Sequence, residues 1–339
     1  MKVTTIGLDL AKRVFQLHWV DMETGEICRR QLKRDQVAEF FANREPAVVA
    51  MEACGSAHYW GRKLKGFGHE VRLIAAQFVR PFVKTNKTDA ADARAIWGAV
   101  QRPEMKFVAL KSEAQQGVLS LHRMREQLVK MRTMQTNQLR GLLYEFGADL
   151  PQGRQKGMAR VGDELARLEG SLSGTVIEAV RDQLKRIEGL DKDIADIEKK
   201  LTAWKKEEKS AKKLMEIPGV GLLTATAAVA MIGDAKAFNS GREFAAFVGL
   251  VPRQSGTGGR VKLLGISKRG DVYLRTLLIH GARSVITRQK EREPWLDKLL
   301  ARRPFNAVAV ALANKMARTI WALLAHDREY QRGYVAKAA

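Results

Sequence analysis

The first hundred residues alternate between short apolar runs and segments with helical spacing. Runs rich in β-branched and aromatic residues predict five strands, at 3–9, 13–20, 26–32, 46–51 and 70–74. Apolar residues spaced by three and four predict helices, at 35–43, 57–67, 76–83 and 88–100. Three neighbouring strands followed by alternating helices and strands indicate an α/β domain, with a mixed five-stranded sheet and helices on its faces.

The middle of the chain has a purely helical pattern. Residues 113–146 and residues 176–213 both carry apolar side chains every three or four positions, and Asp191 interrupts the second stripe. Between them, residues 151–175 contain a proline and several glycines. Two long helices joined by such a connector predict an antiparallel, coiled-coil-like hairpin. A plain helical core layer would give the same pattern.

The segment 214–234 places Pro218, Gly219 and Gly221 between two helical stretches. This arrangement is typical of a helix-hairpin-helix, in which backbone N–H groups at Gly219 and Gly221 would bind a phosphate. An ordinary packing corner between two helices is the alternative interpretation.

Helical spacing also predicts two closing helices, at 272–288 and 305–326. We therefore expect three domains. They are an α/β domain at 1–110, a helical hairpin at 111–213 and an all-α C-terminal domain at 214–339.

Charge narrows the class of partner. The 59 lysines and arginines outnumber the 37 aspartates and glutamates, which gives a formal net charge of +22. Such an excess favours nucleic acid, because basic side chains release the counterions condensed on phosphates. An anionic membrane is less favoured, since the basic residues run along the whole chain and not beside one amphipathic anchor.

Two further compositional features narrow the class of protein. Cys28 and Cys54 are too few for a thiolate zinc site, and we expect both to lie reduced in a core. We find no signal-peptide pattern and no apolar run near the about 18 residues of a membrane span. The sequence therefore predicts a soluble cytoplasmic protein.

Four carboxylates mark the predicted α/β domain. Asp9 ends the first strand, Glu52 ends the fourth, and Asp89 and Asp92 share one face of the helix at 88–100. Taken singly, Asp9 suits a turn, and Asp89 and Asp92 suit a helix cap. In this strand order, however, strands one and four lie side by side and the helix crosses their ends, so the four groups converge. Their repulsion predicts a divalent cation, Mg²⁺ or else Mn²⁺, which would serve phosphodiester chemistry.

The motifs GLDLAK, MEACG and DAADA resemble the RuvC-type, RNase H-like domain of the IS110 family of insertion-sequence transposases. The later motifs IPGVG, FAAFVGLVPRQ and GISKRGDVYLRTLLIHGAR are similar to the second conserved region of that family, closest to its IS1111 branch. The resemblance implies a catalytic, metal-binding Asp-Glu-Asp-Asp tetrad, which maps to Asp9, Glu52, Asp89 and Asp92.

The stretch 249–271, GLVPRQSGTGGRVKLLGISKRGD, is basic and rich in glycine. The resemblance implies that a serine here attacks DNA and forms a covalent phosphoserine, with the tetrad supplied by another subunit. We assign this nucleophile to Ser255. Thr257 is the alternative, because the hydroxyl nearest the glycine pair in many relatives falls closer to it. A mobile basic loop that merely touches phosphates is the remaining interpretation. We expect nucleic-acid contacts from Arg253, Arg260, Lys262, Lys268, Arg269 and Arg275.

The resemblance also implies partners. They are donor and target DNA, a structured non-coding guide RNA called the bridge RNA, and further copies of the chain, from a dimer to a tetramer. It implies a bacterial, nucleoid-associated location as well. Two alternative functions remain at this stage. One is a metal-dependent endonuclease of the junction-resolvase type, in which water attacks, and the other is a non-catalytic nucleic-acid-binding protein.

Overall fold

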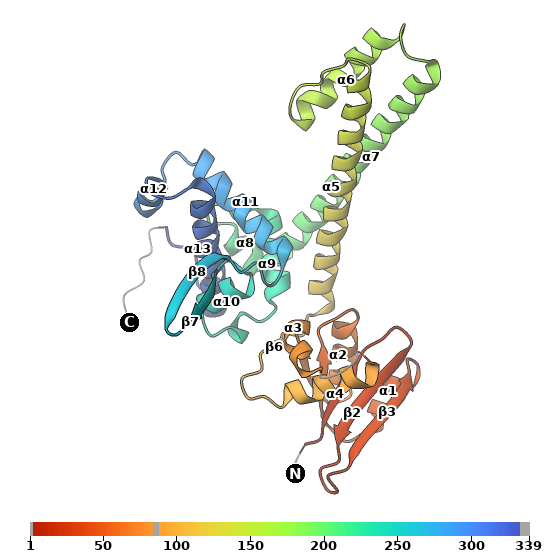
Figure 1. Ribbon diagram of the computed structural model, residues 1–339, viewed down its shortest axis with the longest axis vertical. Helices are drawn as coiled ribbons and strands as arrows, with labels where there is room; N and C mark the ends of the chain where they lie inside the picture. The colour runs from red at the N-terminus through yellow and green to blue at the C-terminus, as the bar shows by residue number, and fades with distance from the viewer. Residues whose placement is uncertain (1–2, 84–87, 333–339) are drawn as a thin grey trace. The chain divides into compact units, whose positions relative to one another are not determined.

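The computed structural model describes residues 3–83 and 88–332, and it shows two compact units (Figure 1). The N-terminal unit extends to Glu113 and includes Ile232–Ala237. The C-terminal unit consists of Ala114–Met231 and the chain from Phe238 onward.

The N-terminal unit is built on a six-stranded sheet with the strand order β3-β2-β1-β4-β5-β6. The central strand β1 pairs antiparallel with β2 and parallel with β4. The strands are β1 (Thr5–Asp9), β2 (Val14–Val20), β3 (Ile27–Lys33), β4 (Val48–Glu52), β5 (Glu70–Ile74) and β6 (Phe107–Val108). The prediction of five strands was wrong by one, because β6 has only two residues and carries no periodic signal.

Helices cover the two faces of this sheet. They are α1 (Gln36–Ala42), α2 (Ala57–Gly66), α3 (Ala76–Val79), the 3₁₀ helix η1 (Arg80–Phe82) and α4 (Asp89–Val100). On one face, Phe41 of α1 and Trp60 of α2 join a buried apolar cluster with Phe15 of β2. On the other face, Ile96 of α4 packs with Ala50 of β4.

Helix α4 lies unusually close to β1. A Cβ placed on Gly7 would come within 2.3 Å of the carbonyl oxygen of Ala93 and 2.7 Å of the backbone nitrogen of Trp97. Only glycine allows this approach, which places the first turn of α4 over the end of β1.

In the C-terminal unit, α5 (Glu113–Glu145) and α7 (Gly174–Glu207) run antiparallel as the two arms of a hairpin (Figure 1). The side chains that join them fix the direction. Arg125 contacts Glu198 and Arg132 contacts Asp191, whereas Gln183 donates to the carbonyl oxygen of Gln135. Partner numbers on α7 therefore fall as those on α5 rise.

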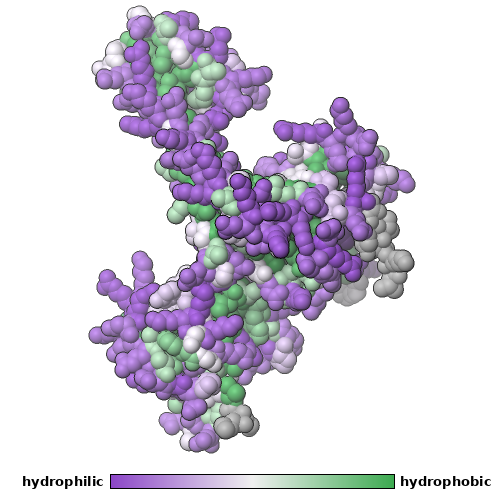
Figure 2. Space-filling view, turned by 180° about the vertical axis from the view of Figure 1, so that it is seen from behind, coloured by the Kyte–Doolittle hydropathy of each residue, from purple (hydrophilic) through white to green (hydrophobic). Residues whose placement is uncertain are grey.

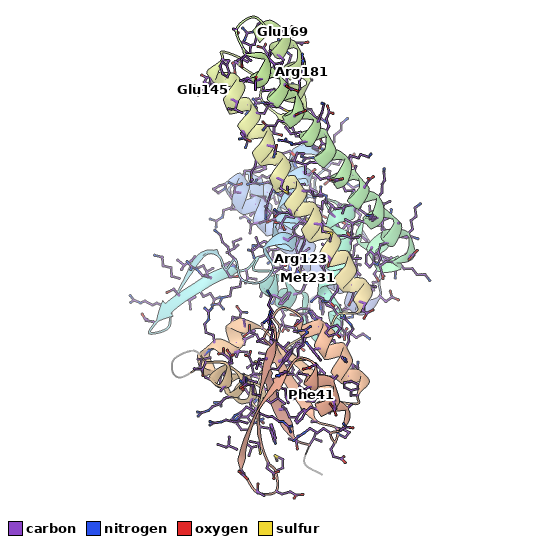
Figure 3. The ribbon with its side chains drawn as sticks, turned by 90° about the vertical axis from the view of Figure 1, so that its right-hand side faces the viewer. Phe41, Arg123, Glu145, Glu169, Arg181 and Met231 are labelled. Carbon is purple, nitrogen blue, oxygen red and sulfur yellow. The ribbon has the colours of Figure 1, made fainter. Side chains whose placement is uncertain are left out.

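The connector of this hairpin contains a helix, α6 (Arg154–Leu168), where the glycines and the proline indicated only an interruption. Its buried residues Val161, Leu165 and Leu168 pack with Leu143 of α5 in one apolar cluster. Arg181 of α7 forms an ion pair with Glu169 at the end of α6, with 3.7 Å between Nη2 and Oε1 (Figure 3).

The rest of the unit contains six helices and one pair of strands among the described residues. They are α8 (Lys209–Leu214), α9 (Leu222–Ile232), α10 (Gly241–Phe247), β7 (Pro252–Thr257), β8 (Arg260–Ile266), α11 (Val272–Arg288), α12 (Pro294–Leu300) and α13 (Phe305–His326), with the 3₁₀ turn η2 (Ala235–Ala237) in the N-terminal unit. The strands β7 and β8 form an antiparallel hairpin (Figure 1), so the expectation of an all-α domain was wrong at this point.

Helix α13 is long and apolar enough, by length and composition, to cross a membrane. This finding corrects the expectation that no stretch comes near that length. Its buried residues include Val308, Leu312, Met316 and Ile320, spaced by four along one face. That pattern is typical of a core helix.

The interruption at Asp191 has a structural explanation. Its two carboxylate oxygens accept hydrogen bonds from Nη1 of Arg132 on α5 and from Nη1 of Arg154 on α6, both at 2.6 Å. The side chain of Arg132 is only 19% exposed. One acid therefore pairs with a largely buried arginine and ties three helices together, which fixes their register.

Replacing Asp191 should test this role. We expect Asp191→Ala to lower the free energy of unfolding by about 1–3 kcal/mol, because the largely buried guanidinium of Arg132 loses its partner. Chemical denaturation followed by circular dichroism measures the change. The matched control is Asp196→Ala on the same helix, which removes an exposed pair with Lys199 and should change little. Equal effects of the two substitutions would contradict the proposed role.

Candidate functional site

Three carboxylates of the predicted tetrad meet at one edge of the N-terminal sheet. Asp9 ends β1, and Asp89 and Asp92 lie in the first turn of α4. One carboxylate oxygen from each lies within 4.8 Å of those of the other two. Thr88 caps α4 by accepting from the backbone N–H of Ala91 at 3.3 Å. This cap leaves both acids of the first turn for the cluster.

Glu52 lies at the same edge but outside this group of three. It ends β4. The register pairs Leu8 of β1 with Met51 of β4, so the next residues, Asp9 and Glu52, lie at the same end of these two parallel strands. Its carboxylate is near enough for its negative charge to raise the pKa of Asp9. The structure thus brings three acids together and places the fourth beside them.

The pKa of Asp9 reflects the electrostatics of the cluster. Burial, and after it the charges of Asp92, Asp89 and Glu52, together raise the pKa of its carboxyl from 3.8 to about 6. Four acids at one edge, with no basic partner to the cluster among the described residues, suit a divalent cation. The donor atoms are all carboxylate oxygens, which hard cations such as Mg²⁺ and Mn²⁺ prefer.

The two cysteines do not lie in a core. Cys28 is half-buried and Cys54 is exposed, so that expectation was wrong. Burial of its sulfur, together with the charges of Glu52 and Asp9, raises the pKa of the Cys54 thiol. This thiol therefore belongs to the acidic edge, and its position two residues after Glu52 is the sequence signal for that placement.

The basic, glycine-rich stretch forms the β7–β8 hairpin instead of an irregular loop. Its two-residue turn is Gly258-Gly259, with φ of 56° and 78°. Two successive positive φ values are typical of a type I′ turn, which suits the twist of a hairpin. The backbone of β8 comes close to Gly256, since a Cβ at this position would lie 2.5 Å from the carbonyl oxygen of Arg260.

Both candidate nucleophiles are exposed on this hairpin. Ser255 pairs with Lys262 and Thr257 pairs with Arg260 across the two strands. Because alternate residues of a strand point to the same side, Ser255 and Thr257 share one face, and Lys262 and Arg260 lie on that face with them. The hairpin therefore presents two hydroxyls beside two cations, and Arg253 is exposed in the same strand.

The base of the hairpin corrects one prediction. Arg275 is buried, and its Nη1 donates to the carbonyl oxygens of Val248 at 2.9 Å and of Arg269 at 2.8 Å. It therefore holds the hairpin's base together and does not offer its charge to a phosphate. Lys268 and Arg269 remain exposed beside it.

The Gly219–Gly221 turn serves helix packing. A Cβ on Gly219, whose φ is 84°, would lie 2.7 Å from the carbonyl oxygen of Gly281 on α11. Gly221 precedes α9 and has open space where a Cβ would be. The packing corner therefore explains Gly219, and a phosphate contact stays a prediction for this turn.

Comparison with known proteins decides the family. The family model described as "Transposase IS116/IS110/IS902 family" matches residues 211–296, and a second transposase model matches residues 6–147. The chain is 49% identical over 338 residues to a probable family 20 transposase of Pseudomonas aeruginosa, which covers 98% of this chain and 100% of that one. The chain belongs to the IS110 family of transposases.

Two more relatives of this IS110-family transposase carry the names of insertion sequences. The transposase for IS1111A of Coxiella burnetii is 41% identical over 335 residues, covering 98% of this chain and 92% of the relative. The transposase for IS1328 of Yersinia enterocolitica is 40% identical over 325 residues, covering 94% and 96%. The protein is thus a transposase, an enzyme that acts on DNA, and its family suggests use of a divalent metal.

The raised pKa of Asp9 predicts a pH dependence for the metal-free transposase. Because the folded pKa of about 6 exceeds the unfolded value of 3.8, the folded state binds more protons between these values. This contribution to stability is complete below about pH 4 and is lost as the pH rises through about 6. We expect Asp9→Asn to raise the free energy of unfolding at pH 8 by about 1–2 kcal/mol after solvent screening, and to change it little at pH 4.

Thermal unfolding in a chelator at both pH values measures this effect. Glu23→Gln, which removes an exposed carboxylate from the β2–β3 turn, is the matched control. Added Mg²⁺ should then stabilise the wild type more than Asp9→Asn, because the cation binds the folded carboxylates. A variant that Mg²⁺ stabilises as strongly as the wild type would show that the ion binds elsewhere.

Proposed function

We propose that this transposase cuts and rejoins DNA through a serine–phosphate intermediate, and that Ser255 is its nucleophile. The observation that carries the proposal is the hairpin face on which Ser255 lies across from Lys262, beside Thr257 and Arg260. A primary hydroxyl attacks phosphorus with less crowding than the β-branched hydroxyl of Thr257, which stays the alternative. In the attack, the serine oxygen forms a bond to phosphorus and the bond from phosphorus to one DNA oxygen breaks.

The groups around the hydroxyl support this step. Lys262 and Arg260 place positive charge where the phosphate oxygens gain negative charge during the attack. The serine hydroxyl gives up its proton to solvent as it attacks, and the DNA oxygen takes up a proton and leaves as a hydroxyl. In the rejoining step, a DNA hydroxyl attacks the phosphoserine and releases Ser255 unchanged. The exposed position of the hairpin suits a substrate as large as a DNA duplex.

The acidic cluster is the second half of the proposed active site. Asp9, Asp89 and Asp92, with Glu52 beside them, would hold Mg²⁺, or Mn²⁺ in its place. A bound cation would polarise the phosphate and lower the pKa of the attacking hydroxyl. We propose that the cluster of another subunit completes each serine site, as the family resemblance implies.

The proposal predicts a covalent adduct between protein and labelled DNA that survives denaturation. We expect the adduct in the wild type and in Ser267→Ala, which removes the next serine of the chain, and its loss in Ser255→Ala. Thr257→Val should keep the adduct. Denaturing electrophoresis with donor and target duplexes, Mg²⁺ and the RNA flanking the gene measures it.

Each other outcome selects an alternative. An adduct that persists in Ser255→Ala and disappears in Thr257→Val would assign the nucleophile to Thr257. Cleavage without any adduct would favour the metal-dependent endonuclease, in which water attacks. Binding without cleavage would leave only a nucleic-acid-binding protein.

Guidance by a structured non-coding RNA is part of the proposal. The family resemblance implies it, and the excess of 59 basic over 37 acidic residues fits RNA as well as DNA. Omitting the flanking RNA, or replacing it with an RNA of scrambled sequence, should abolish the adduct at the element's own sites. An adduct that forms equally without RNA would reject the guidance and leave the serine assignment intact.

We also propose a homo-oligomer, from a dimer to a tetramer. Apolar side chains are exposed along α5, among them Met124, Met131 and Leu142. Figure 2 shows hydrophobic surface (green) among hydrophilic residues at the distal end of the hairpin. Exposed apolar rows of this kind mark protein contacts.

Sedimentation tests the assembly. We expect the wild type to sediment as a dimer or larger, and Met131→Glu with Leu142→Glu to shift the population toward the monomer. Lys185→Glu on the exposed surface of α7 provides a matched change of charge. A wild type that stays monomeric with its nucleic acids bound would contradict the proposal.

A further inference from the structure

The N-terminal unit also carries a group of arginines, on and next to β3, that lies apart from the acidic cluster. The guanidinium of Arg30 on β3 lies over the ring of Phe40, with 5.0 Å from Cζ to the ring centroid. The guanidinium of Arg44, after α1, lies over the same ring at 5.2 Å and over Trp19 at 4.7 Å. Two cations therefore share one aromatic ring.

No acid neutralises this pair through an ion pair among the described residues. The charge of Asp21 acts on Arg44, but its carboxylate accepts hydrogen bonds from the backbone of Glu23 and Thr24. Burial lowers the pKa of Arg44, and the like charge of Arg30 lowers it too. Aromatic contacts thus hold two repelling cations close together, and an anionic ligand would relieve the repulsion.

The pair continues along β3 toward the acidic edge. Arg34 follows the end of β3 and lies over Trp60, with 5.3 Å to the centroid, and Lys63 lies over the same ring at 5.6 Å. The register places Lys33 beside Val14 and Gln16 beside Asp9, so Arg34 is at the Asp9 end of the sheet. Arg30 stands four residues earlier, about 13 Å along the strand.

We infer that Arg44, Arg30 and Arg34 form a docking row for the phosphate backbone of a DNA duplex. A row of that length spans about four base pairs at 3.4 Å each. Planar guanidinium groups offer paired N–H donors to phosphate oxygens, and their stacking on Phe40, Trp19 and Trp60 holds them in place before binding. The row lies on the sheet face that carries Phe40 and Trp60, whereas Asp9 lies on the face that α4 covers, so the row would hold a duplex apart from the acidic cluster.

The test is the salt dependence of duplex DNA binding by the full chain in a chelator, where no cleavage occurs. Each lost phosphate contact lowers the slope of log K against log salt by about 0.9. We expect Arg30→Gln and Arg44→Gln each to lower it by about one, and the double variant by about two. The binding measurement requires neither a bound metal nor attack by a serine, so its result does not depend on the proposed cleavage mechanism.

The matched control is Arg72→Gln in the same unit. Arg72 also stacks on an aromatic ring, Phe107, at 5.2 Å, but it forms an ion pair with Glu70 at 2.7 Å. The same loss of charge there should leave the slope unchanged. Equal slopes for all variants, or equal losses for Arg72→Gln and Arg30→Gln, would overturn the docking row. A lowered slope with RNA but not with DNA would overturn its assignment to DNA.

A measurement on the wild type tests the same inference even if the variants fail to fold. A dicarbonyl reagent modifies accessible arginines, and peptide mass spectrometry reads each site. We expect duplex DNA to protect Arg30 and Arg44 several-fold more than Arg72. Equal protection of the three arginines would overturn the inference.

Discussion

The close packing of α4 on β1 is the contact on which the acidic cluster depends. Gly7 leaves the space that the backbone of Ala93 and Trp97 fills, and the apolar face of α4 is buried against the sheet. This packing carries Asp89 and Asp92 to Asp9 against the repulsion of their charges. Burial, and after it the charges of the neighbouring acids, raise the pKa of Asp9, because the fold holds its carboxyl where the ionised form is disfavoured. Apolar contacts elsewhere in the unit stabilise an arrangement that the acids alone would not adopt.

The sequence was sufficient to predict this cluster because each acid has a readable position. Asp9 and Glu52 end strands, and the alternation of strands and helices predicts that β1 and β4 are neighbours, which the sheet order confirms. Asp89 and Asp92 share a helix face by their spacing alone. The distances between the carboxylates could not be predicted from the sequence. The sequence could not show that three of the carboxylates lie within 4.8 Å of one another while Glu52 lies beside them.

The features that sequence reasoning missed share a physical cause, because none of them leaves a periodic apolar pattern. The β7–β8 hairpin is exposed on nearly all of its residues, so burial imposes no alternation on it, and its one hairpin signal is the Gly258-Gly259 pair, which did not enter the sequence-based prediction. Arg275 is charged but buried, and backbone carbonyls satisfy its guanidinium. A cation in a basic segment predicts solvent exposure, and only the tertiary structure shows that this one holds the hairpin's base.

The net charge of +22 predicts an anionic partner without saying which cations meet it. The structure separates them by their partners. Arg125 and Arg132 pair with Glu198 and Asp191 inside the helical hairpin, so acids already neutralise their charges and the pairs fix the register of the two helices. Arg30 and Arg44 have aromatic rings in place of acids, so their charges stay available. The N-terminal unit therefore holds acids without bases at Asp9 and bases without acids at Phe40. The two groups lie on opposite faces of the sheet, so each suits its own ligand group, a hard cation at the acids and phosphate at the arginines.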